Sequence, residues 1–410
     1  MSLFRAQSGF NSLTSTFKSA FRHVALGAGL TVAIVAGSGA HAQALDSTLN
    51  EQVAMVPAYT SGGNIELETT IFRPPGKGPF PLVIMNHGKE RGKPGEQKRD
   101  RFLALSREFV KRGYAVVVPM REGFSKSGGS YVEINCDMSR NGQIQADSLQ
   151  GTVEYFSRQS WVDKNRIIVA GQSYGGLATM AFGTRDIPGV KGLINFAGGL
   201  KYHGGTCQWE NSLEQAFAQF GAKSHVPSLW FYGENDSHFA HQLANRLHQA
   251  YTANGGLAKL VAFGSFKRDA HGLVGSRDGV PIWWPETEAF LRQIGMPTEV
   301  TVALAEPARP ARSEYAALDN VEAVPFIRQN GRDAYRNFLT KSSPRAFAVG
   351  SNGAWSWAEE GDDPAARALE SCKRDSGQTC QLYAVDDYVV WSSQPSQPVM
   401  ASTTPGSAGR

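Results

Sequence analysis

Short apolar segments alternate with amphipathic segments along most of the chain. Apolar or alternating runs predict strands at residues 64–73, 80–85, 114–120, 166–170, 190–196, 227–232 and 259–263. Apolar residues at helical spacing predict helices over 100–110, 145–159, 176–182, 212–220, 238–253 and 288–294. Strands that alternate with helices indicate right-handed crossovers and a mostly parallel sheet with helices on both faces. We therefore expect an α/β domain over residues 43–296, with an extended lead-in before its first strand.

A second, smaller unit is predicted over residues 313–395, after a Pro/Ala-rich linker at 297–312. It has apolar or aromatic strand candidates near residues 346–349, 355–357, 381–385 and 388–391. The dipeptide Asp363-Pro364 predicts a helix start, because proline is favoured at the first helical position. We expect a small C-terminal α+β module, followed by a disordered Ser/Pro/Thr-rich tail at residues 396–410.

Residues 1–42 have the layout of a secretory signal peptide. They carry three basic residues and no acidic one, then a small and apolar run at 24–36, and end on Ala40-His41-Ala42. An uncleaved anchor or a mis-chosen start codon are the alternatives, since the basic region is long. Export is the expectation, with no membrane span after cleavage.

Removal of this segment also changes the charge balance. The whole chain has 41 basic and 37 acidic residues, and loss of the segment leaves 38 against 37. The basic run at residues 89–101 mixes both signs and has no aromatic residue, so it is typical of a solvated loop. We expect no nucleic-acid partner.

The four cysteines predict two disulfides, because their number is even and export favours oxidation. Spacing pairs Cys372 with Cys380, and Cys136 with Cys207. No cluster has zinc-like spacing, so we expect neither a metal site nor a cofactor.

The most informative motif is Gly171-Gln172-Ser173-Tyr174-Gly175. A buried strand is predicted directly before it and a helix directly after it. A G-x-S-x-G pentapeptide in this context is typical of a nucleophile elbow, which presents a serine hydroxyl on a strained turn. The motif therefore predicts nucleophilic catalysis by Ser173.

An activated serine needs a base and an acid that orients the base. Asp236 follows the predicted strand 227–232, and His271 follows the strand 259–263, in the order that the elbow architecture requires. Glu234 is the alternative acid. His238 and His241 are rival bases, although we expect both on the surface of the next helix. Asp269 is expected to be a loop or capping residue.

These three separated motifs resemble the α/β-hydrolase superfamily, in particular its dienelactone-hydrolase-like and prolyl-oligopeptidase-like branches. The resemblance spans residues 60–295 and implies Ser173 as nucleophile, Asp236 as triad acid and His271 as general base. It also implies an oxyanion hole formed by the backbone amides of Tyr174 and Lys89, because residues 86–89 resemble the family's HG-x motif.

Three further expectations concern the surroundings of this site. His87 is expected to pack and hydrogen-bond within its loop, and residues 121–128 are expected to shape the rim of a pocket. No large cap insertion follows residue 196, which leaves Trp209, Phe217 and Phe220 as possible pocket walls.

The resulting hypothesis is an exported serine hydrolase that cleaves small carboxylic esters through an acyl-enzyme. An exported serine peptidase of the prolyl-oligopeptidase type is the alternative within enzymes. A non-catalytic envelope-binding protein is the alternative from another class.

Overall fold

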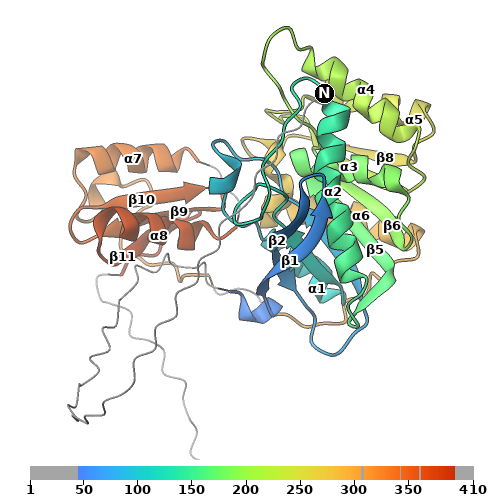
Figure 1. Ribbon diagram of the computed structural model, residues 1–410. Coiled ribbons are helices and arrows are strands. Elements are labelled where there is room, and N and C mark those ends of the chain that lie inside the picture. Colours follow the sequence, from blue (N-terminus) through green and yellow to red (C-terminus); the bar gives the residue numbers. More distant parts are fainter. Residues whose placement is uncertain (1–44, 306–308, 342, 360–361, 393–410) are drawn as a thin grey trace, which may run out of the picture. The chain divides into compact units, whose positions relative to one another are not determined.

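The computed structural model describes residues 45–305, 309–341, 343–359 and 362–392. The predicted signal peptide and the predicted tail at 396–410 lie outside these residues. The described chain forms two separate sheets, one of eight strands and one of four (Figure 1). Within the described part, no helix is both long enough and apolar enough to cross a bilayer.

The eight-stranded sheet has the order β1-β2-β4-β3-β5-β6-β7-β8. Its strands are β1 (Gln52–Thr60), β2 (Gly63–Phe72), β3 (Phe80–Asn86), β4 (Ala115–Pro119), β5 (Val162–Gln172), β6 (Val190–Phe196), β7 (Ser228–Gly233) and β8 (Ala258–Phe263). The strands from β4 to β8 in this order are parallel, while β1 and β2 form an antiparallel hairpin at one edge. The α/β class with a mostly parallel sheet is confirmed, and the expected lead-in is in fact a long edge strand.

Helices cover both faces of this sheet (Figure 1). They are α1 (Leu103–Lys111), α2 (Met138–Phe156), α3 (Tyr174–Phe182), α4 (Trp209–Gly221), α5 (His241–Ala253) and α6 (Val280–Gln293). Single-turn or two-turn 3-10 helices lie at Ser47–Leu49, Pro94–Glu96, Gly183–Arg185, Ala270–Gly275, Arg277–Gly279 and Val321–Ala323. Two predicted helices begin elsewhere than expected, since α2 and α6 start well before residues 145 and 288.

The two faces have separate cores because successive strand residues point to opposite sides. In β3, Leu82 and Ile84 pack with α2 to α5, whereas Val83 and Met85 pack with α1 and α6. All four side chains are fully buried. This explains why β3 reads as a continuous apolar run, which is the pattern of a strand buried on both faces.

The C-terminal sheet is antiparallel with the order β10-β9-β11-β12. Its elements are α7 (Gln329–Leu339), β9 (Arg345–Gly350), β10 (Trp355–Glu359), α8 (Pro364–Ser376), β11 (Cys380–Val385) and β12 (Tyr388–Val389). Alternation in β9 again sorts the side chains, with Ala346 and Ala348 against α8, and Phe347 and Val349 in the cluster with α7. The helix α8 begins where predicted, and Asp363 caps it by accepting from the amide of Ala366.

The structure contains both expected disulfides. Cys136–Cys207 joins the segment before α2 to the segment before α4, across 71 residues of sequence. Cys372–Cys380 joins α8 to β11, across 8 residues. The first bond therefore closes a far longer loop than the second.

We predict that removal of the longer cross-link destabilises the protein more. Loop-closure entropy of the unfolded chain gives losses of about 4 kcal/mol for Cys136→Ser/Cys207→Ser and about 2.5 kcal/mol for Cys372→Ser/Cys380→Ser. Urea unfolding of the two double variants measures both values. Equal losses, or the reverse order, would contradict an entropic origin of the stabilisation.

Candidate active site

Ser173 lies between β5 and α3 with a backbone conformation that is rare for a residue with a side chain. Its φ is 57° and its ψ is −123°. Such a conformation costs on the order of 1–3 kcal/mol and persists only where the surroundings impose it. The Ser173 amide donates to the Phe196 carbonyl at 2.9 Å, and the Ser173 carbonyl accepts from the amides of Leu177 and Gly199. The turn is thus fastened to β6 and to the loop that follows β6.

The glycines around Ser173 are required by close backbone approach. A Cβ on Gly175 would lie 2.3 Å from the Asn86 carbonyl oxygen and 2.5 Å from that of His87. A Cβ on Gly171 would lie 2.2 Å from the Gly175 carbonyl oxygen. The first turn of α3 consequently sits directly against the end of β3, which is the geometry of a nucleophile elbow.

His271 and Asp236 are joined by a hydrogen bond of 3.0 Å between Nδ1 and Oδ2. The second oxygen of the buried Asp236 carboxylate accepts from the amides of His238 and Phe239, at 2.7 and 2.8 Å. A carboxylate partner requires the proton on Nδ1, so the other ring nitrogen of a neutral His271 is left as an acceptor. This is the arrangement that a general base needs.

Asp269, in the loop that carries His271, also binds the loop that carries Asp236. Asp269 accepts from the amides of His271 and Ser237, at 2.9 and 3.0 Å, and from the Ser237 hydroxyl. Asp269 is therefore the capping residue that the sequence indicated. In addition, the Gln172 side chain donates to the His271 carbonyl at 3.1 Å, which links the base loop to the residue before Ser173.

The alternative residues have other surroundings. Glu234 is exposed and accepts from the Ser265 hydroxyl, and His241 lies on α5 beside Asn245. His238 is exposed as expected, but it precedes α5 and its ring lies 4.3 Å from the ring of His271. Burial, and next the neighbouring His271, lower the pKa of His238. The contact was missed because helical spacing alone placed His238 on a solvent-facing helix surface.

The loop after β3 passes beside the proposed nucleophile. A Cβ on Gly88 would lie 3.2 Å from the Cβ of Ser173. The next residue, Lys89, directs its side chain to Glu133 at 2.8 Å and over the ring of Tyr131. On the other side, Tyr174 is the first residue of α3, so its amide has no partner within the helix. Tyr174 thus directly follows Ser173, whereas Lys89 follows Gly88, the residue whose backbone lies beside Ser173.

His87 and Arg121 hold this loop from below, and both are fully buried. The Arg121 amide donates to His87 Nε2 at 3.0 Å, so the protonated Nδ1 donates a hydrogen bond to the Gly88 carbonyl at 2.6 Å. The Arg121 guanidinium donates to the His87 carbonyl at 2.5 Å and to Gln145 at 2.9 Å. His87 packs and hydrogen-bonds as expected, whereas Arg121 is an interior residue and does not line a pocket rim.

Two of the three residues expected as pocket walls, Phe217 and Phe220, do not line a pocket. Phe217 and Phe220 are buried in the core between α4 and the sheet, and only Trp209 is partly exposed. They face the sheet because α4 buries its apolar stripe, which sequence alone does not orient.

Among the described residues, no group of three or more His, Cys, Asp or Glu could hold a metal ion.

A strained serine after a central parallel strand, followed by an Asp–His pair at the ends of later strands, defines the α/β-hydrolase architecture. The resemblance to this superfamily is confirmed. Residues 62–215 match the family model described as X-Pro dipeptidyl-peptidase (S15 family). This family belongs to the α/β-hydrolase clan, so the match supports a hydrolase of that type.

Individual relatives are distant. The chain is 25% identical over 137 residues to the quorum-quenching protein AidA of Acinetobacter baumannii, which is 33% of this chain and 42% of that protein. The chain thus spans less than half the length of this relative.

Similar solved structures include the Pyrococcus furiosus esterase Pf2001, with 14% identity, 62% of this chain, 94% of that chain and a TM-score of 0.45. A puromycin-hydrolyzing peptidase of Mycobacterium tuberculosis has 18% identity, 62% and 41% coverage and a TM-score of 0.47. Est1E of Butyrivibrio proteoclasticus, solved with ferulic acid, has 20% identity, 58% and 99% coverage and a TM-score of 0.43.

Gly175→Ala should destabilise the protein by about 1–3 kcal/mol, because the new methyl group meets two backbone carbonyl oxygens that cannot move independently. Gly264→Ala is the matched control, since a Cβ there meets nothing within 4 Å. Urea unfolding compares the two variants. A Gly175→Ala protein as stable as the control would show that the elbow is not packed as described.

The buried His87 should make stability fall in mild acid. Burial, and next the Arg121 charge, hold the pKa of His87 well below its ordinary value, although the Asp100 carboxylate lies 3.9 Å from its Nδ1. Below about pH 6.5, His87 is protonated in the unfolded chain but stays neutral in the folded protein. The free energy of unfolding should therefore fall with decreasing pH, by up to about 1.4 kcal/mol per pH unit from this residue.

His87→Gln should remove that part of the slope between pH 7.5 and 5. The exposed His225 gives the control variant His225→Gln, which should retain the slope of the unmodified protein. Urea midpoints measured across the range supply both slopes. Identical slopes in all three proteins would refute the assignment.

Proposed function

We propose that the chain is an exported serine hydrolase that cleaves carboxylic esters through Ser173, His271 and Asp236. The observation that carries the proposal is the Asp236–His271 hydrogen bond at the strand ends next to the strained Ser173. Three acceptor contacts fix the Asp236 carboxylate, and Gln172 fixes the backbone of His271. A base oriented in this way needs little reorganisation during the reaction.

In this mechanism His271 takes the proton of the Ser173 hydroxyl while the oxygen attacks the ester carbonyl carbon. The negative charge that develops on the carbonyl oxygen is stabilised by the amides of Tyr174 and Lys89. His271 then gives its proton to the leaving alcohol, and an acyl-enzyme remains. Water, activated by the same imidazole, releases the acid and restores Ser173.

Peptide cleavage is the second candidate, because the matched family model describes X-Pro dipeptidyl-peptidases. The same residues would serve, with the amine protonated by His271 as it leaves. A panel of dipeptidyl amides, X-Pro amides included, separates the two activities. Cleavage of amides without turnover of short esters would favour the peptidase.

Export is supported by the two disulfides, since such bonds persist in oxidising compartments. We further propose that the partner of the protein in catalysis is a small-molecule ester substrate.

The proposal predicts the ranking of four variants against p-nitrophenyl acetate and butyrate. Ser173→Ala and His271→Gln should lose at least about 10³-fold in kcat/KM, and Asp236→Asn should lose about 10³- to 10⁴-fold through a misoriented imidazole. Glu234→Gln should stay within about twofold, because the exposed Glu234 carboxylate accepts from the Ser265 hydroxyl, whereas the His271 imidazole is bonded by Asp236.

A fluorophosphonate probe provides a readout that does not depend on the choice of ester. It should label Ser173 in the unmodified protein and not in Ser173→Ala. An unlabelled protein without esterase activity would instead indicate a non-catalytic binding protein.

A further inference from the structure

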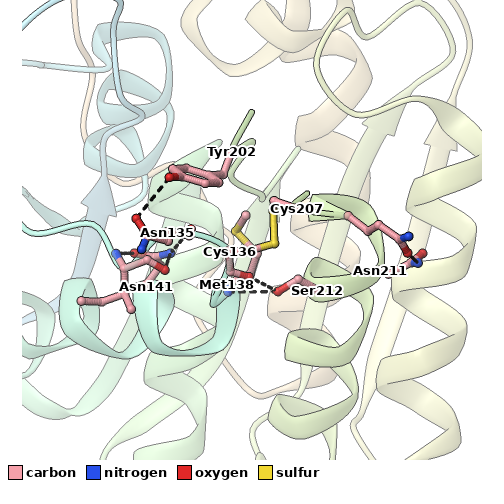
Figure 2. The surroundings of a disulfide bond; sticks show 10 residues. Asn135, Cys136, Met138, Asn141, Tyr202, Cys207, Asn211 and Ser212 are labelled. Atoms are coloured by element: carbon pink, nitrogen blue, oxygen red, sulfur yellow. Dashed lines mark hydrogen bonds between the residues drawn. A yellow bond between two sulfur atoms is a disulfide. The ribbon is translucent and has the colours of Figure 1, made fainter. Parts of the chain in front are cut away.

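An open cavity of about 560 Å³ lies beside the Cys136–Cys207 disulfide. Its walls are the segment before α2, the loop between β6 and α4, and the first turns of α4. Figure 2 shows the disulfide between these segments, with Tyr202 and Asn135 meeting on one side and Asn211 pointing from α4 on the other.

The cavity is lined by neutral polar groups. Four side-chain amides line it, together with three hydroxyl groups: Asn135, Gln208, Asn211, Gln215, Tyr202, Thr206 and Ser212. Of the eleven lining residues, all of which the structure describes, none carries a charge. An ionic ligand would find no counter-charge among these side chains, and a long acyl chain would find no aliphatic side chain to pack against.

The donors and acceptors match a ligand with several hydroxyl groups. A side-chain amide offers two N–H donors and a carbonyl acceptor, and a hydroxyl both donates and accepts. A sugar presents the same combination on each of its hydroxyl groups, around a compact uncharged ring. Amide and sugar groups can therefore satisfy each other in both directions.

The cavity is held in shape by contacts of its own. The Tyr202 hydroxyl donates to Asn135 Oδ1 at 3.2 Å, and the side-chain amide of Asn141 donates to the backbone carbonyl of Asn135 at 3.4 Å. The Ser212 hydroxyl donates to the Cys136 carbonyl and accepts from the Met138 amide at 3.3 Å. Such preorganisation lowers the entropic cost of ligand binding.

Two links place the cavity close to the proposed nucleophile. Gly199 donates its amide to the Ser173 carbonyl, and Tyr202 follows three residues later, so the chain spans at most about 11 Å between them. The Tyr174 hydroxyl donates to the Asn141 carbonyl at 3.5 Å, and Asn141 in turn holds the segment of Asn135. Two of the segments that line the cavity are thus linked by hydrogen bonds to Ser173 or to the residue after it.

We propose that this cavity binds the uncharged sugar part of an ester whose carbonyl reacts at Ser173. The inference rests on the proposed esterase function and adds the class of substrate: acyl esters of neutral saccharides. The side chains of Asn211 and Gln215, both exposed on α4, are assigned to contact the sugar hydroxyl groups.

The test compares two acetate esters of similar size. Methyl 6-O-acetyl-glucopyranoside carries the hydroxyl groups, and cyclohexylmethyl acetate lacks them; galactose and xylose analogues complete the panel. At least one sugar ester should have a kcat/KM at least tenfold above that of the cyclohexyl ester. Asn211→Ala/Gln215→Ala should remove this preference and leave turnover of p-nitrophenyl acetate within twofold.

Gln219→Ala is the matched control, since Gln219 is exposed on the same helix but does not line the cavity. It should keep the preference. Equal kcat/KM for the sugar and cyclohexyl esters, or a preference that the double variant retains, would overturn the proposal.

A binding measurement separates this proposal from the esterase function. Saturation-transfer NMR with methyl glucopyranoside, methyl galactopyranoside and methyl xylopyranoside should detect at least one of them in the Ser173→Ala protein, and the double variant should abolish the signal. Binding without any ester turnover would reject the proposed reaction and retain the sugar site. Ester turnover without sugar binding, or equal binding of cyclohexylmethanol, would reject the sugar site and retain the reaction.

Discussion

The left-handed backbone of Ser173 is the constraint on which the rest of the site depends. A residue with a Cβ adopts this conformation only if its neighbours exclude the relaxed alternatives. They do so because α3 starts in contact with the carbonyl oxygens at the end of β3, an approach that only Gly175 permits. The strain is thus balanced by the packing of a central strand, and the large buried core of that sheet keeps the serine in place.

The loops that carry Asp236 and His271 are coupled by a reciprocal exchange of hydrogen bonds. Asp236 binds the ring of His271, and Asp269, next to the base, binds the loop of Asp236. Each loop supplies a carboxylate to the other, so neither can move without breaking contacts in both. The His238 ring lies 4.3 Å from the imidazole of His271 and adds a second titratable ring beside it. Asp236 and His238, which are two residues apart in the sequence, consequently both contact His271.

The parts of the fold that sequence could predict are those in which local pattern and tertiary burial agree. The buried strands from β3 to β7 are apolar on both faces, and their positions were correct within a few residues. The start of α2 was missed because the buried residues Asn141 and Gly142 are polar or small, and their place in the interior comes from neighbours distant in sequence. The helix α7 was missed since only Gly331, Tyr335 and Phe338 form its buried stripe, in an otherwise polar segment.

The candidate site divides along the same line. The order of Ser173, Asp236 and His271 after successive strands is a one-dimensional pattern, and the hydrogen bond between the last two is the contact that this order implies. Sequence could not show that Asp236 also caps the turn before α5. His238 lies in this turn, before α5 begins at His241, and its ring meets the ring of His271 there.

Two different devices organise the two halves of the proposed substrate site. Around Ser173, positions are fixed by strand packing and backbone strain, which suits a group that must stay within a fraction of an ångström of the reacting carbon. Around the polar cavity, the walls are two loop segments and the first turns of α4. There the bond between Cys136 and Cys207 joins the two loop segments covalently, because polar walls gain little rigidity from apolar burial. The disulfide thus limits the movement of this neutral hydrogen-bonding surface, as the packing of the sheet limits the movement of the proposed nucleophile.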